Sequence, residues 1–370
     1  GTVDIDLNVE DKRPLHGSLE LNNRYSANTT ALRLNGSLSH GNVWQLGHTA
    51  GGNFQVAPEN PDDALVYSGY YLARVSDGVS LMLQGTWQDS DISTLGGAAV
   101  AGRGHVLGVR AMYDLPSTAT FYQTFSLGVD YKNFSEDIVI GKDVISSPIE
   151  YWPLSANYGA TWLAEKAFTE ANVSLNFHAR GWGSKETDYA NKRYEADANY
   201  VFLKGDVAHT RDMADGSQWF GKVQGQVASR PLVNGEQISG GGLGTVRGYL
   251  EATALGDNGI FFTGEYRTPS LIGKGGKDGA KDPLDGDDAA AHADASEWRF
   301  HVFTDAGLVG IWEPLPGQQR RFGLASAGAG TRFKAFKHYN GSLDVAVPFI
   351  GQSDAEAGEV RVTFRGWAEF

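Results

Sequence analysis

The fold is indicated most clearly by the stretch VRVTFRGWAEF at residues 360–370. Its residues alternate between two sets, so a β-strand made from them has two different faces. One set is Val360, Val362, Phe364, Gly366, Ala368 and Phe370, and the other is Arg361, Thr363, Arg365, Trp367 and Glu369. The first face suits hydrocarbon and the second suits water. A strand with this pattern is typical of a membrane-spanning β-barrel.

The same period of two recurs through the rest of the chain, and helical periodicity is hardly seen. Clear examples are residues 15–22, 79–88 and 172–180, in which apolar or small residues alternate with polar ones. Read in order, the sequence predicts sixteen strands, at residues 15–25, 29–39, 47–57, 65–76, 79–89, 103–115, 120–134, 154–165, 168–182, 195–211, 217–229, 258–268, 297–309, 321–334, 339–348 and 359–370.

Strand length separates two architectures that both show such alternation. A soluble β-sandwich has strands of about 5 to 6 residues, whereas a tilted transmembrane strand needs about 9 to 11. The predicted runs are of the longer kind, and short turns such as 76–78 and 116–118 alternate with longer loops such as 89–102 and 183–193. We therefore expect an all-β fold, a 16-stranded antiparallel transmembrane β-barrel over residues 15–370, with both ends on the periplasmic side.

Composition excludes several other classes of protein. The 370 residues contain no cysteine, which excludes a disulfide scaffold and a thiolate zinc site. No stretch approaches the roughly 18 to 20 apolar residues of a membrane-spanning helix. The formal net charge of -13 argues against nucleic acid as a partner, because phosphate binding requires a basic surface.

Two segments fall outside the strand pattern. Residues 1–14 contain one short alternating strand and are expected to be the end of a preceding periplasmic domain. Residues 271–296 are expected to form a flexible periplasmic turn, because the run 274–288 is rich in Asp, Gly, Lys and Ala. The aspartates of this run lack the spacing of an EF-hand, so a solvated loop is favoured over a calcium site.

A glycine-rich stretch, GGGLGTVRGYLEATALGDN at residues 240–258, is too long for a hairpin turn. Loops of this length usually have a function. We expect residues 230–258 to fold into the lumen of the barrel, with Arg247 near the tip. The stretch is neither a dinucleotide fingerprint nor a phosphate loop, and the chain contains no HExxH or GxSxG motif. We therefore expect no enzyme activity, no cofactor and no metal.

Strand parity predicts what the tip of this loop contacts. In the strand at 258–268, Ile260 and Phe262 belong to the lipid face, which places Glu265 in the lumen. In the strand at 297–309 the same reasoning places Asp305 in the lumen. A guanidinium can bridge two carboxylates with charge-assisted hydrogen bonds, so Arg247 is their natural partner. The alternative is that Arg247 lies in solvent and Asp305 is one of many lumen charges.

Three ordered motifs resemble a known superfamily. The segment Val246-Arg247-Gly248-Tyr249 resembles the signature of the sixth extracellular loop in the outer-membrane assembly and secretion superfamily. The segments at 264–269 (GEYRTP) and 303–307 (FTDAG) resemble the motifs that follow it. In that family the loop arginine pairs with acidic residues on two strands. The resemblance therefore implies a loop lock made of Val246, Arg247, Gly248, Tyr249, Glu265 and Asp305, supported by Phe303 and Gly307, and an outer-membrane targeting role for Phe370.

Within this superfamily the chain looks most like the TpsB transporters of two-partner secretion. The segments at 17–23, 41–47 and 324–330 carry this closer resemblance. A TpsB protein has periplasmic POTRA domains and a plug helix before its barrel. The resemblance therefore implies that residues 1–14 are the C-terminal remnant of a POTRA domain, and that the chain is an isolated barrel domain.

The resemblance implies a translocation pore in the outer membrane of a Gram-negative bacterium, which secretes a large unfolded exoprotein of the adhesin or haemolysin type without nucleotide hydrolysis. The other expected partners are outer-membrane lipid and, during biogenesis, the barrel assembly machinery, and the pore is expected to be monomeric. Three alternatives stay open. They are the barrel of an outer-membrane assembly factor, the barrel of a patatin-like autotransporter and a passive porin.

Overall fold

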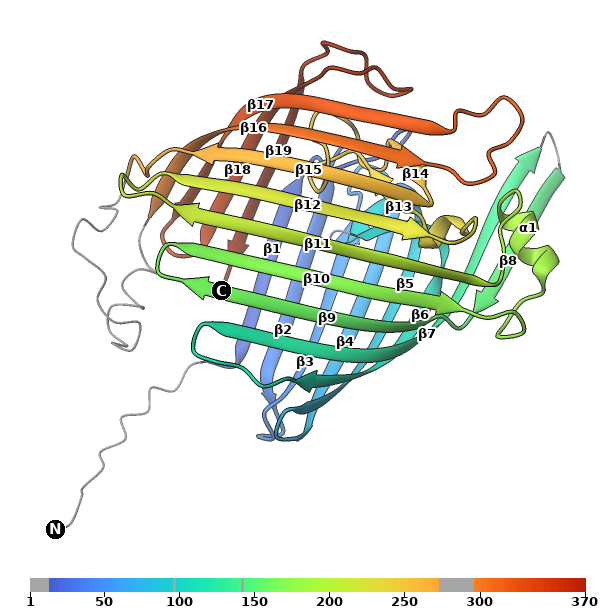
Figure 1. The fold of residues 1–370 in the computed structure, drawn as a ribbon, viewed down its shortest axis with the longest axis horizontal. Helices are drawn as coiled ribbons and strands as arrows, with labels where there is room; N and C mark the ends of the chain where they lie inside the picture. The colour runs from blue at the N-terminus through green and yellow to red at the C-terminus, as the bar shows by residue number, and fades with distance from the viewer. Residues whose placement is uncertain (1–12, 96–97, 141–142, 273–295) are drawn as a thin grey trace.

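The protein forms a closed, antiparallel β-barrel (Figure 1), in a computed structural model that describes residues 13–95, 98–140, 143–272 and 296–370. The sheet has 17 strands, of which β8 is paired with the far end of β7 and the other sixteen form the wall. The wall closes where β1 pairs with β19, with Ser18 opposite Glu369 and Asn22 opposite Arg365. This confirms the architecture predicted from the alternation.

The sixteen strands of the wall follow one another in chain order. They are β1 Leu15–Asn22, β2 Arg33–Val43, β3 His48–Val56, β4 Ala64–Ser76, β5 Val79–Leu95, β6 Ala98–Asp114, β7 Phe121–Ile140, β9 Leu154–Ala164, β10 Ala167–His178, β11 Tyr200–Asp212, β12 Gln218–Ala228, β15 Asn258–Arg267, β16 Glu297–Gly310, β17 Arg321–Ala335, β18 Tyr339–Pro348 and β19 Arg361–Glu369. The remaining elements are η1 Pro61–Asp63, β8 Asp143–Tyr151, α1 Glu186–Lys192, η2 Asn234–Glu236, β13 Ile238–Gly240 and β14 Ala254–Gly256.

The strand bounds differ from the prediction mainly at one end of the barrel, which we call the loop end and which lies opposite the C-terminus (Figure 1). There β5 and β6 stay paired as far as Leu95 and Ala98, where a loop was expected over 89–102. The expected loop at 183–193 contains α1, whose start is marked by a hydrogen bond of 2.9 Å from the Lys185 backbone N–H to Asp188 Oδ2. Consequently β10 ends and β11 begins four and five residues short of the predicted bounds.

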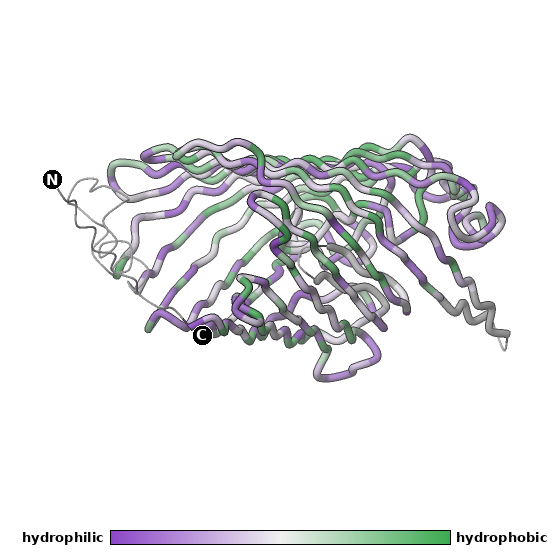
Figure 2. The backbone as a smooth tube through the Cα atoms, turned by 90° about the horizontal axis from the view of Figure 1, so that it is seen from below, coloured by the Kyte–Doolittle hydropathy of each residue, from purple (hydrophilic) through white to green (hydrophobic). Residues whose placement is uncertain are grey.

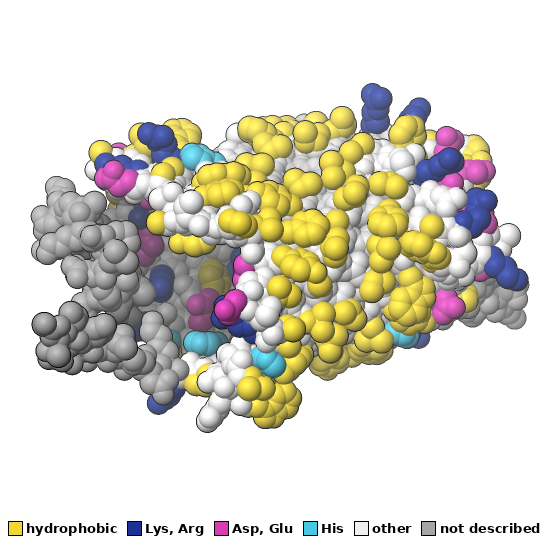
Figure 3. Space-filling view, turned by 60° about the horizontal axis from the view of Figure 1, so that its bottom comes forward, with side chains coloured by type: hydrophobic (Ala, Val, Ile, Leu, Met, Phe, Trp, Pro, Cys, Tyr) yellow, Lys and Arg dark blue, Asp and Glu magenta, His cyan; other side chains and the backbone are white. Residues whose placement is uncertain are grey.

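The two faces of the wall are separated as the alternation predicts. On the outer face, large apolar side chains are exposed, among them Leu83, Val173, Phe262 and Val302. Figure 2 shows hydrophobic and hydrophilic residues alternating along the strands. In Figure 3 the apolar side chains cover the middle of the visible face and charged side chains gather toward its ends. This is the pattern of a wall that is surrounded by lipid at its middle.

Two groups of apolar residues are buried in the described part of the chain. One lies at the loop end and includes Tyr151, Tyr189, Tyr200 and Leu232. The other joins the glycine-rich loop to the wall and consists of Ile238, Val246, Tyr249, Ala254, Phe261, Val309, Leu324 and Ala355. Among the described residues, no helix is long and apolar enough to cross a membrane.

Three of the sequence predictions fall on residues outside the described ranges. These are the short strand before residue 13, the aspartate-rich run at 274–288 and most of the turn at 271–296. The assignment of residues 1–14 to a POTRA domain therefore stays a prediction.

Candidate functional site: the loop lock

The glycine-rich loop is tied down at its base by a small two-stranded sheet. In this sheet β13 pairs with β14, with Ile238 opposite Gly256 and Gly240 opposite Ala254. Gly248 has a φ of +92°, and a Cβ at that position would lie 3.3 Å from the Cβ of Ala346 on β18. Only glycine combines this left-handed backbone with so close an approach to the wall. The tip of the loop therefore lies directly against the wall.

Arg247 is the centre of a buried network at this tip. Its Nε and Nη2 donate to Asp305 Oδ2 and Oδ1 at 2.7 and 3.0 Å, and its backbone N–H donates to Oδ2 at 3.1 Å. Its Nη1 donates to Glu265 Oε2 at 2.7 Å. The guanidinium is thus paired in fork geometry with one carboxylate and in single contact with the other. The structure brings Arg247 together with Glu265 and Asp305, the two carboxylates that strand parity placed in the lumen.

The ring of Phe303 supports the guanidinium from one side. The Arg247 Cζ lies 3.4 Å from the centre of this ring, which is a cation–π contact. Phe303 on β16 lies opposite Gly328 on β17. A side chain at position 328 would collide with the ring, because its Cβ would lie 2.5 Å from the Phe303 Cζ. Gly307 fulfils a similar steric requirement, since a Cβ there would lie 2.4 Å from the Cδ1 of Phe261. Both motif residues predicted as supports therefore contact the site or its packing.

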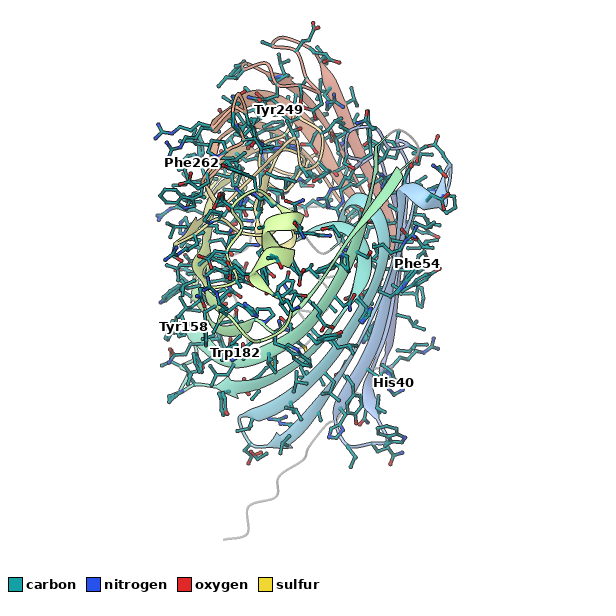
Figure 4. The ribbon with its side chains drawn as sticks, turned by 90° about the vertical axis from the view of Figure 1, so that its right-hand side faces the viewer. His40, Phe54, Tyr158, Trp182, Tyr249 and Phe262 are labelled. Carbon is teal, nitrogen blue, oxygen red and sulfur yellow. The ribbon has the colours of Figure 1, made fainter. Side chains whose placement is uncertain are left out.

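Val246 and Tyr249 anchor the two sides of the tip. Val246 is fully buried in the apolar cluster with Phe261 and Leu324. The Tyr249 hydroxyl donates to the carbonyl oxygens of Ala325 and Ile350 at 3.1 and 2.7 Å, and accepts from the Ala325 N–H at 3.2 Å. In Figure 4, Phe54, Tyr158 and Phe262 lie at the outer margin of the barrel, whereas Tyr249 lies nearer its interior. Apolar packing therefore holds the tip on both sides of the charged centre.

Further charged residues complete the network. Strand parity also places Arg267 and His301 in the lumen, although the predicted lock does not include them, and Arg332 and Asp344 were not predicted at all. Arg267 Nε donates to Glu265 Oε1 at 2.7 Å, and Arg332 Nη2 lies 3.1 Å from the same oxygen. Asp344 Oδ1 lies 3.5 Å from Arg247 Nη1 and 2.7 Å from His301 Nε2. Three arginines thus lie near the three buried carboxylates, which reduces the cost of burying these charges. Strand parity alone could have placed Asp344 in the lumen. Its apolar neighbours Leu343 and Val345 are exposed on the outer face, and successive side chains of a strand point to opposite faces.

A second network lies near the loop end and is also absent from the prediction. Arg193 follows α1, and its Nη1 and Nη2 donate to Asp257 Oδ1 and Oδ2, each at 2.8 Å. Asp257 also accepts from the backbone N–H groups of Leu232 and Trp312, each at 2.7 Å. The two guanidinium nitrogens donate in turn to the carbonyl oxygens of Leu232 and Trp312. We call this set the loop-end staple, because it joins three separate connections between strands.

Two polar residues that strand parity assigns to the lumen, Gln224 and Arg180, lie in different surroundings. Gln224 lies on the inner face and its Nε2 donates to the Gly244 carbonyl of the loop at 2.7 Å. Arg180, by contrast, lies beyond the end of β10, and its Nε donates to Glu186 of α1 at 2.6 Å. Its side chain is exposed among the connections of the loop end. Arg180 therefore does not line the membrane-spanning wall, because the strand ends earlier than predicted.

The fold defines the chain as a transmembrane β-barrel of the outer-membrane class. The family model for the haemolysin secretion/activation protein ShlB/FhaC/HecB matches residues 1–278. The chain therefore belongs to this family, which confirms the resemblance drawn from the motifs. The family and the fold together indicate a Gram-negative outer-membrane protein.

Solved structures share the fold at low sequence identity. CdiB from Escherichia coli is 17% identical with a TM-score of 0.75, and the match covers 98% of this chain and 64% of that chain. CdiB from Acinetobacter baumannii is 14% identical with a TM-score of 0.65, over 97% of this chain and 60% of that one. BamA from Haemophilus ducreyi lacking POTRA domains 1-3 is 14% identical with a TM-score of 0.64, over 98% and 71%. The sequence matches no curated protein.

Proposed function

We propose that this chain is the barrel of an outer-membrane pore that secretes a large partner exoprotein in two-partner, type V secretion. Membership in the haemolysin secretion/activation family is the observation that carries the proposal. The chain spans 64% of the length of the E. coli CdiB chain that it matches. POTRA domains before the barrel would complete the transporter, and an unfolded adhesin or haemolysin is the partner that fits it.

The loop lock supports a specific role for Arg247 in this function. The tip shares the interior with any polypeptide that crosses the barrel, so its position decides how much of the lumen is free. Arg247 holds the tip through hydrogen bonds to Asp305 and Glu265, on adjacent strands. We infer that the lock keeps the loop in one defined position. The exoprotein crosses in an extended form, in contact with polar inward groups such as Gln224, Lys222 and Asn176.

No step of this transport uses a nucleotide. In the glycine-rich loop, the Gly241 N–H donates to Thr245 Oγ1 at 2.8 Å. We propose that folding of the exoprotein outside the cell biases its movement outward. Catalysis has no part in this proposal.

Secretion by the full-length protein tests the proposal. Wild type and Arg247→Ala are compared at matched outer-membrane levels, for export of the genetically adjacent large exoprotein. We expect export to depend on the protein and to fall strongly with Arg247→Ala, because the lock is lost while the barrel still assembles. Arg74→Ala is the matched control, since Arg74 is exposed at the far end of β4.

Other outcomes would assign another function. If no exoprotein depends on the protein and its depletion impairs insertion of other barrels, it is an assembly factor. If small solutes permeate at the same rate with and without Arg247, it behaves as a passive porin. A lipase domain fused before the barrel of the full-length protein would identify a patatin-like autotransporter.

A further inference from the structure

An apolar groove lies on the outer surface of the wall at the loop end, away from the loop lock. Its volume is about 500 Å³, and its lining includes Val227, Ile260, Leu308, Trp312, Arg320 and Arg321. The four apolar side chains among these are between 36% and 60% exposed. They come from β12, β15, β16 and the connection after β16. The groove is therefore open to whatever surrounds the barrel.

The groove changes from polar to apolar along the strands. At its outer edge, Asn258, Gly310 and Arg321 are direct neighbours across β15, β16 and β17. The next outward row toward the middle of the wall contains Ile260 opposite Leu308. Gly310 contributes no side chain, and a Cβ there would find its nearest neighbour 3.9 Å away, so the groove is open at this point. A molecule with a polar head and apolar chains fits this order of residues.

The two arginines at the polar edge, Arg320 and Arg321, have exposed side chains. Within the described ranges, neither Arg320 nor Arg321 has a side-chain hydrogen bond or an ion pair, and no carboxylate is part of the groove lining. Their backbones are ordered by the hairpin, where the Ile311 N–H donates to the Arg320 carbonyl at 2.9 Å. Two adjacent guanidinium groups with no acidic partner form a site for an anion, and phosphate matches their planar donor geometry.

The wall of the groove is held in place from inside the protein. The indole Nε1–H of Trp312 donates to the Ala228 carbonyl at 3.0 Å, which joins the connection after β16 to the end of β12. The backbone N–H of Trp312 donates to Asp257 of the loop-end staple. A ligand that enters the groove therefore meets a preformed surface and causes little ordering of side chains.

We propose that this groove binds a phosphate-bearing lipid of the outer leaflet. The phosphates would contact Arg320 and Arg321, and the acyl chains would lie on Val227, Ile260 and Leu308. In this class of barrel the longer loops are extracellular, so the loop end faces the cell exterior. This places the arginines at the level of the lipid headgroups of the outer leaflet. Free phosphate would use the arginines without the apolar row below them. A soluble protein partner would compete with the lipid that surrounds the apolar part of the wall.

Native mass spectrometry of the full-length protein in neutral detergent tests the proposal. The probes are bisphosphorylated lipid A and the same lipid without its phosphates. We expect one tightly retained bisphosphorylated lipid per protein, and about tenfold weaker retention in Arg320→Gln/Arg321→Gln, because each cation near a headgroup contributes to lipid affinity. Arg320→Lys/Arg321→Lys keeps both charges but removes the planar donor geometry, so its retention should lie between that of wild type and that of the Gln variant. Arg74→Gln/Arg211→Gln removes two exposed arginines at the opposite end and should bind as wild type.

A second variant tests the apolar part of the groove independently of the arginines. Gly310→Leu fills the open point and should weaken lipid retention while the heat-modifiable migration of the folded barrel is unchanged. Equal retention of the dephosphorylated lipid, or an equal loss in the control pair, would overturn the proposal. So would displacement of the lipid by inorganic phosphate at the same concentration, because this would identify a simple phosphate site.

Discussion

The loop lock and the loop-end staple are both built around an arginine that forks onto a buried aspartate, yet Arg247 is buried and Arg193 is half-buried, and their surroundings differ. Arg247 lies among other ionic groups, because Glu265 also contacts Arg267 and Arg332, and Asp344 also contacts His301. Arg193 and Asp257 are surrounded instead by backbone N–H and carbonyl groups. One arginine is held by charges on the wall, and the other by the chain segments that it joins.

The difference determines which buried groups lose their partners when each arginine is released. When Arg247 leaves, Glu265 and Asp344 keep partners, so the cost of release falls mainly on Asp305, whose side-chain hydrogen bonds all come from Arg247 within the described residues. When Arg193 leaves, two backbone carbonyls lose their donor together with Asp257. We infer that release of the lock leaves fewer buried polar groups without a partner than release of the staple would.

Loss of Arg247 should have the largest effect. Removing one partner of a buried ion pair costs about 3–5 kcal/mol, so Arg247→Ala should release the loop. Because the chain contains no cysteine, Val246→Cys introduces a single buried thiol that reports on release. Maleimide labelling of this thiol should become at least about 100-fold faster in Arg247→Ala, since 1.36 kcal/mol corresponds to a factor of ten. Arg74→Ala in the Val246→Cys background is the control. If Val246→Cys is labelled at the same rate with and without Arg247→Ala, Arg247 does not hold the loop in place.

Asp257→Asn should loosen the loop end by a smaller amount. The change removes the charge of Asp257 but keeps one acceptor, at a cost of about 2 kcal/mol for charge-assisted hydrogen bonds. Trypsin should then cleave after Lys192 or Arg193 about 30-fold faster. Labelling of Val246→Cys should stay at the wild-type rate. If labelling accelerates as well, the lock and the staple act as one unit and the comparison fails.

A double variant tests whether Asp305 bears the cost of release. Adding Asp305→Asn to Arg247→Ala removes the unpaired buried carboxylate and should recover about 1–3 kcal/mol of barrel stability. The midpoint of heat-modifiable migration should rise above that of Arg247→Ala. The loop should stay released in the double variant, as judged by Val246→Cys labelling. A lower midpoint would show that Asp305 has other partners after release.

Asp344→Asn should have the smallest effect on the lock. Its contact with Arg247 is long, at 3.5 Å, and an asparagine oxygen can still meet His301. We expect a loss of less than about 1 kcal/mol and a change in Val246→Cys labelling of less than about fivefold. Labelling as fast as in Arg247→Ala would instead assign the main anchor to Asp344.

Periodicity explains why so much of the wall was predictable. A period of two is a local property of the chain, and one buried or lipid-facing side fixes the parity of a whole strand. For this reason residues 258–268 and 297–309 predicted β15 and β16 closely, along with the inward direction of Glu265 and Asp305. The same reasoning missed the paired extensions of β5 and β6 over 89–102, where a loop was expected, and the pairing of β8 with the far end of β7.

The sequence by itself determined the barrel, the number of its strands and the inward direction of Glu265 and Asp305, because these follow from alternation along single strands. Only the tertiary structure decided which inward residues meet. Arg332 and Asp344 reach the lock from β17 and β18, and Arg193 meets Asp257 across 64 positions of the chain. Such pairs depend on how the barrel closes and how its connections fold back, and no local period records that geometry.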